Sequence, residues 1–183
     1  MRIIGGALRG RRLIAPAGSA TRPTADRVRQ ALFDILAHAP WSEPGTIEGA
    51  RVLDAFAGSG ALGLEALSRG AAEAVFFETD ARACRALSAN IAGCGMEGRA
   101  RIIAADAARP PPGAPCSLVF LDPPYGEAAL PARALAALVA AGWLAPAAFV
   151  VVETAADSTL PPLATLLAER RHGAARLGFF RYP

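Results

Sequence analysis

An alternation of short apolar segments with longer amphipathic ones constrains the fold of this chain more than any other feature. The alternation begins at Arg51 and continues to Val152. The apolar segments lack a regular polar alternation, which is typical of strands whose two faces are both covered. The stretches between them carry apolar residues at helical spacing. We therefore expect strands at 52–55, 74–77, 118–121 and 149–152, and another that runs from Arg101 to near Asp106. We expect one helix that ends at Leu67 and two more that cover 81–91 and 130–141.

The order of these segments predicts a doubly wound α/β fold. Strands that alternate with helices form mostly parallel sheets through right-handed crossover connections, with helices on both faces. In such sheets, ligands bind beyond the carboxyl ends of the central strands. The residues with the most distinctive chemistry in this chain directly follow the expected strands.

The longest uncharged stretch is the 19 residues from Ala134 to Val152. That length reaches the lower limit for a helix that spans a membrane. Gly142 and Pro146 interrupt the stretch, whose first part is rich in alanine and leucine and whose second part is aromatic and β-branched. A helix, a turn and a buried strand explain it better than a membrane span.

The first forty residues predict an arm and a helix in front of the alternating region. Residues 2–15 are expected to form a short basic hairpin or an extended arm. A helix follows, with Thr24 as its amino cap and Asp26 in its first turn. Its apolar positions form one buried stripe, made of Val28, Ala31, Leu32, Ile35 and Leu36. We expect residues 1–40 to pack on a main domain of residues 41–183, within a single globular unit.

Charge is distributed unevenly along the chain. The first thirty residues hold seven arginines and one acidic residue, Asp26, so this segment carries +6 although the whole chain carries only +3. A basic segment joined to a mildly acidic body indicates that the amino-terminal part meets a polyanion. A basic face that contacts only solvent explains the charge alone equally well.

The three cysteines, Cys84, Cys94 and Cys116, are too few and too scattered for a disulfide framework. They also lack the paired spacing of a zinc site. No apolar stretch of the signal-peptide type follows the first charges of the chain. We therefore expect a protein of the reducing cytoplasm that holds no metal ion.

A glycine-rich turn, from Asp54 to Gly60, follows the first expected strand. Glycines let backbone amides approach a ligand closely, and the amino terminus of the next helix adds a favourable partial charge. Asp54 precedes the glycines, where its carboxylate would repel the pyrophosphate of a dinucleotide. The position suits a ligand with an ammonium group, such as the methionine part of S-adenosylmethionine. A turn with only a structural role is the alternative.

Glu78 ends the second expected strand, 24 residues after Asp54. An acid at this offset can accept hydrogen bonds from both ribose hydroxyls of a bound nucleoside. The sequence does not fix the direction of the nearby Asp80, so we assign the ribose contact to Glu78. Asp106 follows the third strand and can accept a hydrogen bond from an adenine amino group. The alternative for Glu78 is an acid in a solvated loop.

The most specific motif is the tetrapeptide Asp122-Pro123-Pro124-Tyr125, directly after an apolar strand. Two consecutive prolines continue neither a sheet nor a helix, so they fix a rigid turn at the carboxyl end of the strand. The Asp122 carboxylate and an exposed proline carbonyl can accept hydrogen bonds from an exocyclic NH2 group. Tyr125 offers a flat face on which a base can stack, a contact of roughly 1–3 kcal/mol. A rigid turn with only a structural role is the weaker alternative.

Methylation of a base amino group needs such an arrangement. The lone pair of that nitrogen is delocalised into the ring, so the amine is a poor nucleophile. Two acceptors on its hydrogens draw it towards a tetrahedral shape and free the lone pair to attack a sulfonium methyl group. Positioning supplies much of the remaining acceleration, with the reacting atoms about 3–3.5 Å apart.

These motifs resemble known families. The segment from Asp54 to Glu65, with Glu78 and Asp106, resembles the class I S-adenosylmethionine-dependent methyltransferases. The tetrapeptide is similar to the signature of enzymes that methylate N6 of adenine, N4 of cytosine or N2 of guanine. Other motifs resemble the RsmD family, whose members are bacterial 16S rRNA (guanine-N2)-methyltransferases that act on the small ribosomal subunit. These motifs are Gly5-Gly6, Arg9-Gly10-Arg11, residues 22–29 and Leu32-Phe33. The resemblance extends from about Arg2 to Glu153.

The resemblance implies a Rossmann-like class I methyltransferase fold with a seven-stranded sheet, and S-adenosyl-L-methionine as the cofactor. The implied catalytic residues are Asp122, Pro123, Pro124 and Tyr125. The residues implied to bind the cofactor are Thr24, Arg27, Asp54, Ala57, Gly58, Ser59, Gly60, Glu78, Thr79, Asp106, Ala107 and Asp122. Those implied to contact RNA are Arg9, Arg11, Arg12, Arg22 and Arg29.

The implied partner is 16S rRNA, and residues 41–183 would form the methyltransferase domain. The body has no second large basic patch and no added RNA-binding domain, so we expect a monomer that acts on a partly assembled small subunit. The alternatives are a DNA or other RNA amino-methyltransferase, a glutamine methyltransferase of proteins, and a non-catalytic module that binds S-adenosylmethionine. A DNA enzyme usually needs a separate recognition region, for which the chain leaves little room.

Overall fold

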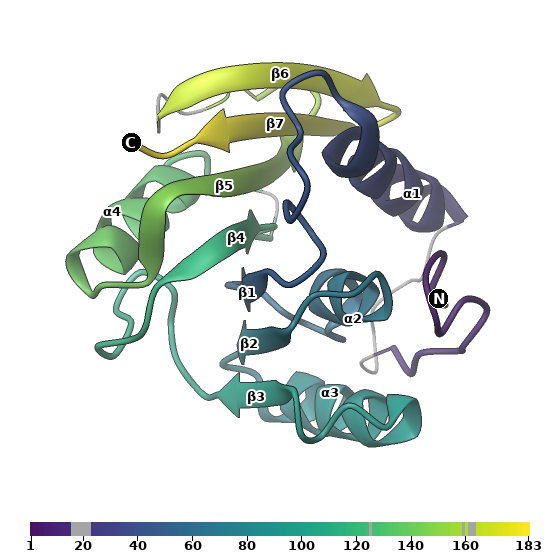
Figure 1. The fold of residues 1–183 in the computed structure, drawn as a ribbon. Helices are drawn as coiled ribbons and strands as arrows, with labels where there is room; N and C mark the ends of the chain where they lie inside the picture. Colours follow the sequence, from purple (N-terminus) through teal and green to yellow (C-terminus); the bar gives the residue numbers. More distant parts are fainter. Residues whose placement is uncertain (16–22, 125, 159, 161–163) are drawn as a thin grey trace.

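The computed structural model describes residues 1–15, 23–124, 126–158, 160 and 164–183, with residues 23–25 described by their backbone alone. In this part of the chain, seven strands form one sheet in the order β3-β2-β1-β4-β5-β7-β6 (Figure 1). The five strands from β3 to β5 are mutually parallel, whereas β7 is antiparallel to both of its neighbours. The strands are β1 (Arg51–Asp54), β2 (Glu73–Phe77), β3 (Ala100–Ile103), β4 (Cys116–Leu121), β5 (Leu144–Ala155), β6 (Thr165–His172) and β7 (Ala175–Arg181).

Helices cover both faces of this sheet, which confirms the predicted doubly wound α/β architecture. Figure 1 shows α1, α2 and α3 on one face and α4 on the other. Their buried side chains belong to two separate core clusters, one on each face, which we call the α1-side core and the α4-side core. The helices are α1 (Pro23–His38), α2 (Ala61–Ser68), α3 (Ala81–Cys94) and α4 (Leu130–Ala140).

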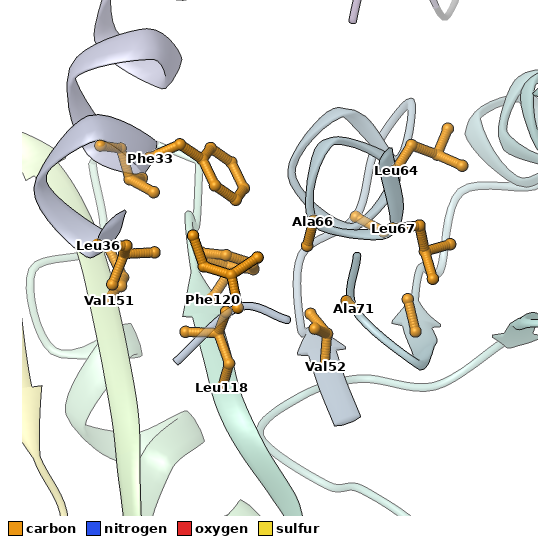
Figure 2. Packing of buried hydrophobic residues seen from close by; sticks show 14 of the residues in the cluster. Phe33, Leu36, Val52, Leu64, Ala66, Leu67, Ala71, Leu118, Phe120 and Val151 are labelled. Atoms are coloured by element: carbon orange, nitrogen blue, oxygen red, sulfur yellow. The ribbon is translucent and has the colours of Figure 1, made fainter. Parts of the chain in front are cut away.

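Burial on both faces explains why the central strands are uninterrupted apolar runs. Along β4, Leu118 and Phe120 pack in the α1-side core, and Val119 and Leu121 pack in the α4-side core. Figure 2 shows Phe33 of α1 above Phe120, and the two ring centroids are 5.7 Å apart. Most side chains of such a strand are removed from water, so few positions favour a polar residue.

Helix α1 has the predicted apolar stripe but not the predicted cap. Val28, Leu32 and Leu36 are buried in the α1-side core, and Asp26 lies in the first turn. The helix begins at Pro23, so the expectation that Thr24 is the amino cap is wrong. Proline suits the start of a helix because its φ angle is already helical and its nitrogen has no hydrogen to leave unpaired.

The uncharged stretch forms a helix, a turn and a strand, as predicted. Helix α4 ends at Ala140, Gly142 has a φ of 80° in the turn, and β5 begins at Leu144. Within the described residues, none of the helices combines the length and the apolar character needed to cross a bilayer.

The sequence patterns missed several features of the sheet. Strand β3 ends at Ile103, not near Asp106, and β5 is much longer than the apolar run at its centre. The resemblance implied seven strands, but the local patterns did not locate β6 and β7, and β6 is an edge strand with exposed polar residues. An edge strand needs neither continuous burial nor a strongly apolar sequence.

The basic arm is a hairpin-like loop held on α2 by the Glu65 carboxylate and by hydrogen bonds to Ser68. Arg2 and Arg12 form an antiparallel bridge, and the amides of Ile4 and Gly5 donate to the two Glu65 oxygens, each at 2.7 Å. The Glu65 side chain is 0% exposed. The same carboxylate pairs with two cations, through Arg69 Nε at 2.8 Å and Arg29 Nε at 3.8 Å.

Replacing Glu65 by Gln should therefore loosen the arm. Loss of the charge leaves Arg69 without its carboxylate partner and Arg29 with Asp26 alone, and breaking a buried ion pair costs about 3–5 kcal/mol of unfolding free energy. Urea denaturation measures the loss, and hydrogen exchange at Ile4 and Gly5 reports whether the arm opens. The matched control is Glu73→Gln, because Glu73 is 45% exposed and pairs with Arg51 near the surface. That change should cost at most about 1 kcal/mol. Equal effects of the two substitutions would contradict this role of Glu65.

Candidate active site

A cavity of about 620 Å³ lies beyond the carboxyl ends of β1, β2, β3 and β4. Strands β1 and β4 are neighbours in the sheet although β2 and β3 lie between them in the chain. Such a switch point leaves a crevice between the connections that lead away on either side, which is where α/β proteins bind ligands. The volume is within the usual range of ligand sites, about 300–1,000 Å³. The residues that line the cavity are Ala55, Phe56, Gly58, Phe77, Glu78, Thr79, Ala105, Asp106, Ala107, Arg109, Asp122, Pro124 and Leu130.

The glycine-rich turn between β1 and α2 forms one wall. Gly58, with a φ of 53°, lines the cavity, and a side chain there would meet no other atom within 4 Å. Its amide donates to Glu78 Oε2 at 2.8 Å. Gly60 has a different role, because a Cβ there would lie 2.3 Å from a methyl carbon of Leu87. The first glycine therefore keeps the cavity open, and the second allows α2 to pack against α3.

Glu78 is oriented by backbone amides at the end of β2. Its second oxygen, Oε1, accepts from the amides of Thr79 at 2.7 Å and Asp80 at 2.8 Å. Asp80 caps α3 by accepting from the amides of Arg82 and Ala83, and these bonds hold the pKa of the Asp80 carboxyl below its usual range. Because Glu78 lines the cavity whereas Asp80 caps a helix, the geometry favours the choice of Glu78 as the ribose acceptor.

Asp106 lines the cavity from the loop after β3. Its Oδ1 accepts from the amide of Ala108 at 2.9 Å, and its Oδ2 lies 3.3 Å from Arg109 Nε. Arg109 is the only basic residue in the described lining, and its side chain is 87% exposed. The carboxylate is thus placed at the cavity wall without a buried counter-ion.

Residues Asp122–Pro124, directly after β4, border the cavity beside the switch point. Asp122 and Pro124 line the cavity, and Pro123 is buried beneath them. Burial raises the pKa of Asp122 well above its usual value, and the charges of Glu153 and Asp54 raise it further. Tyr125 lies outside the described residues.

Asp54 is buried directly behind the cavity. Its side chain is 1% exposed, and Oδ2 accepts from the amide of Gly63 at 3.0 Å. Burial raises the pKa of Asp54 to about 7, and the charge of Glu78 also raises it. Within the described residues Oδ1 makes no hydrogen bond of normal geometry, although the nearby Phe56 amide lowers the pKa of this carboxyl. An unpaired carboxylate oxygen at this position is unfavourable unless a cation or a donor approaches it.

The cavity therefore fits a ligand with positive charge. Asp54, Glu78, Asp106 and Asp122 bring four carboxyl groups to its walls or directly behind them. S-adenosyl-L-methionine carries a sulfonium and an ammonium group, and both would find negative partners here. The fit rests on the orphaned Asp54 oxygen and on the acidic lining.

Some predicted cofactor contacts do not line the cavity. Ala57, Ser59 and Gly60 are buried on the far side of the turn, where Ser59 O accepts from Asn90 Nδ2 at 2.9 Å. Arg27 is exposed on α1 and likewise absent from the lining. The Thr24 side chain lies outside the described part of the chain.

The sequence analysis missed part of the lining. Phe56, Phe77 and Leu130 give the cavity apolar walls, and Arg109 closes it beside Asp106. Phe56 stands inside the glycine-rich turn, so its position was available as a signal. Leu130 comes from the start of α4, and only the packing of that helix brings it to the site.

The arm holds three of the five predicted RNA contacts. Arg9, Arg11 and Arg12 are exposed, and Arg11 also donates to the carbonyl of Gly93 at the end of α3. The expectation for Arg29 is wrong, because its side chain is 5% exposed and pairs with Asp26 and Glu65. Burial lowers the pKa of this guanidinium, while those two carboxylates oppose the change. Arg22 lies outside the described residues.

Replacing Asp54 by Asn should stabilise the protein increasingly as the pH rises. Because the folded-state pKa of about 7 is above the ordinary value, the contribution of Asp54 to stability is complete at low pH and is lost as the pH rises towards 7. Asn stays neutral and retains an acceptor for Gly63. Between pH 5 and pH 8 the variant should gain up to ~3 kcal/mol relative to the parent chain, at ~1.4 kcal/mol for each pKa unit. Urea denaturation at both pH values measures this gain. A difference that does not change with pH would contradict the assignment.

Comparison with known proteins agrees with this geometry. Residues 1–181 match the family described as Conserved hypothetical protein 95. The ribosomal RNA small subunit methyltransferase D of Escherichia coli is 42% identical over 163 residues, which cover 88% of this chain and 78% of that protein. The protein of the same name from Haemophilus influenzae is 39% identical over 181 residues, 94% of this chain and 89% of the relative.

Solved structures have the same fold. A putative methyltransferase from Escherichia coli, yhhF, superposes with a TM-score of 0.84 at 39% identity and covers 100% of this chain and 97% of its own. An RNA methyltransferase from Salinibacter ruber in complex with S-adenosyl-L-homocysteine has a TM-score of 0.68 at 14% identity, with 90% and 94% covered, and shares the fold. The matched family and the identities of these relatives show that this chain belongs to the RsmD family.

Proposed function

We propose that this chain transfers a methyl group from S-adenosyl-L-methionine to the exocyclic N2 of a guanine in 16S rRNA. The observation that carries the proposal is the rigid Asp122–Pro124 turn, which borders an acidic cavity at the switch point of the sheet. The names of the relatives, ribosomal RNA small subunit methyltransferase D, support rRNA as the substrate. The choice of guanine N2 as the methylated atom and of 16S rRNA as the substrate molecule rests on the family resemblance.

Cofactor binding is assigned to residues from three strand ends. Glu78 would accept hydrogen bonds from the ribose hydroxyls, and Asp106 would accept from the adenine amino group. Asp54 would attract the ammonium group through its unpaired oxygen. We retain Gly58, Thr79 and Ala107 as further contacts, since all three line the cavity. The chemistry that S-adenosyl-L-methionine supplies when bound is an electrophilic methyl group on sulfur, which keeps the electron pair of the broken C–S bond.

Asp122 would activate the guanine amine. Its carboxylate accepts one N2 hydrogen and a proline carbonyl of the tetrapeptide accepts the other, which frees the nitrogen lone pair to form the new N–C bond. Methylation makes the nitrogen cationic and its remaining protons acidic, so one is lost to water or to a nearby carboxylate. A cation at the site would favour the ionised form of Asp122. The ionised carboxylate is the form that accepts hydrogen bonds, both when the base binds and during methyl transfer.

The basic arm would bind RNA phosphates near the site. Arg9, Arg11 and Arg12 are exposed on a loop that Glu65 fixes to α2, the helix that begins at the glycine-rich turn. We further propose that the protein acts as a monomer in the cytoplasm and that its substrate is a partly assembled small subunit. Protein-free rRNA as the better substrate would contradict that last proposal.

Asp122→Ala should lower the rate of methyl transfer at least ~100-fold, on the scale of a lost group that stabilises the transition state. The measurement uses tritiated S-adenosyl-L-methionine and small ribosomal subunits from a strain that lacks the corresponding gene. Cofactor affinity, measured by calorimetry, should remain within about tenfold, because other carboxylates hold the ligand. Near-normal turnover would remove Asp122 from the mechanism.

The same assay tests the proposed substrate when naked rRNA, duplex DNA and bulk protein are included. Label recovered as N2-methylguanosine from the small subunit supports the proposal. Label found only in DNA or protein would agree with S-adenosyl-L-methionine as the cofactor but would contradict rRNA as the substrate. Bound cofactor with no transfer to any sample would favour a non-catalytic module.

Replacing Arg9 and Arg12 by Gln should weaken binding to small subunits and reduce its dependence on salt. Each lost phosphate contact should lower the slope of log K against log salt concentration by roughly 0.7–0.9. Filter binding at several salt concentrations gives the slope for both proteins. Arg85 and Arg170 are the matched control, because they are exposed on α3 and on the edge strand β6. Equal slopes for the arm variant and the parent chain would exclude these two phosphate contacts.

A further inference from the structure

Glu153 lies beside the tetrapeptide on the neighbouring strand. The last residues paired between β4 and β5 are Leu121 and Val152, so Asp122 and Glu153 each follow one residue later on adjacent parallel strands. Val152 packs in the α4-side core, and successive strand residues face opposite sides, so Glu153 faces the α1 side. The charge of Glu153 also raises the pKa of Asp122, as expected for neighbouring carboxyl groups.

Pro124 lies between two pockets. Pro124 lines the large cavity and also a second, narrow pocket, whose wall includes Pro123, Glu153 and Thr154. The Thr154 side chain is 7% exposed, and its hydroxyl has no hydrogen-bond partner among the residues that the structure describes. A buried hydroxyl without a partner is uncommon in proteins and indicates that a ligand or water completes the site. The second pocket, which is lined mostly by proline, alanine and glycine, has Glu153 and Thr154 in its wall and adjoins the groups assigned to the amine.

The three bases that amino-methyltransferases modify differ beside the reactive amine. In guanine, the ring nitrogen N1 next to the 2-amino group carries a hydrogen and is a donor. In adenine and cytosine, the ring nitrogen next to the amine carries a lone pair and is an acceptor. An ionised carboxylate only accepts hydrogen bonds, so it binds the first arrangement and repels the second.

We propose that Glu153 accepts the N1–H of the target guanine while Asp122 accepts from its 2-amino group, and that this pair selects guanine over adenine and cytosine. The inference rests on the proposed function and adds a residue that determines the substrate base. A carboxylate offers about four acceptor positions, so Glu153 can receive the base in addition to its contacts within the protein. The two acceptors lie on adjacent strands, as the adjacent donors of guanine require.

The test replaces the target guanine by 2,6-diaminopurine, which keeps the 2-amino group but has an acceptor at N1. Small subunits are reconstituted with 16S rRNA that carries either base at the position that the parent chain methylates. The parent chain should prefer guanine by at least ~100-fold in kcat/KM, because a site built for a donor rejects an analogue that lacks it. In Glu153→Gln, the amide NH2 can donate to N1 of diaminopurine. The preference should therefore fall at least ~100-fold, with cofactor affinity within about twofold.

Two further variants separate recognition from folding. Glu153→Asp retains a carboxylate and should still prefer guanine, although at a lower rate. Glu97→Gln changes an exposed carboxylate in the turn before β3 and should leave both rates unchanged. Thermal unfolding of each variant reports its integrity. A purely structural role of Glu153 would lower both rates by the same factor.

The outcomes distinguish this inference from the proposed function. An unchanged guanine preference in Glu153→Gln, or a diaminopurine preference in Glu153→Asp, overturns the role of Glu153 while the methyltransferase assignment stands. Methylation of neither base by the parent chain would overturn the proposed function, and the inference with it. A fall in preference confined to Glu153→Gln supports the assignment.

Discussion

The parallel pairing of β1 with β4 is the constraint on which the rest of the structure depends. These strands are adjacent in the sheet but far apart in the chain, and their connections leave in opposite directions. The pairing brings Asp54 and Asp122 close enough for the charge of one to raise the pKa of the other. It also requires apolar side chains on both faces of the central strands, which the two cores on either side of the sheet bury. The cavity and its carboxyl groups follow from that arrangement.

The acidic lining is unfavourable for the protein alone. Buried carboxyl groups without counter-ions either take up protons or destabilise the folded state, and the raised pKa values of Asp54 and Asp122 express this cost. A cationic ligand would reduce this cost, because it would supply a partner for the buried carboxyl groups. The free energy of folding that the empty site loses would then contribute to the affinity for the ligand. Hydrogen bonds from backbone amides keep Glu78 and Asp106 in place without adding positive charge to the cavity.

A second buried carboxylate links the arm to this site. Glu65 lies on α2, whose amino terminus ends the glycine-rich turn, and it accepts the amides of Ile4 and Gly5. It therefore fixes a loop with exposed arginines relative to the cavity. In the proposed function, this arrangement would place those arginines near the cavity for contact with RNA phosphates. The cost is a buried cluster of charge, in which Arg29 and Arg69 compensate Glu65.

The sequence by itself determined the doubly wound fold, the helix–turn–strand interpretation of the uncharged stretch, and the motif residues Glu78, Asp106 and Asp122 that meet at one cavity. It succeeded there because apolar periodicity and turn residues act locally, and because parallel strands present their carboxyl ends at one edge. Only the tertiary structure decided which arginines are exposed, since Arg29 and Arg9 look alike in sequence but differ in the carboxylates packed around them. The antiparallel strands β6 and β7, the apolar wall from Leu130 and the proximity of Glu153 to Asp122 likewise depend on strand pairing and helix packing between distant segments. Local patterns carry no information about such contacts, because the residues involved meet only when the whole sheet has formed.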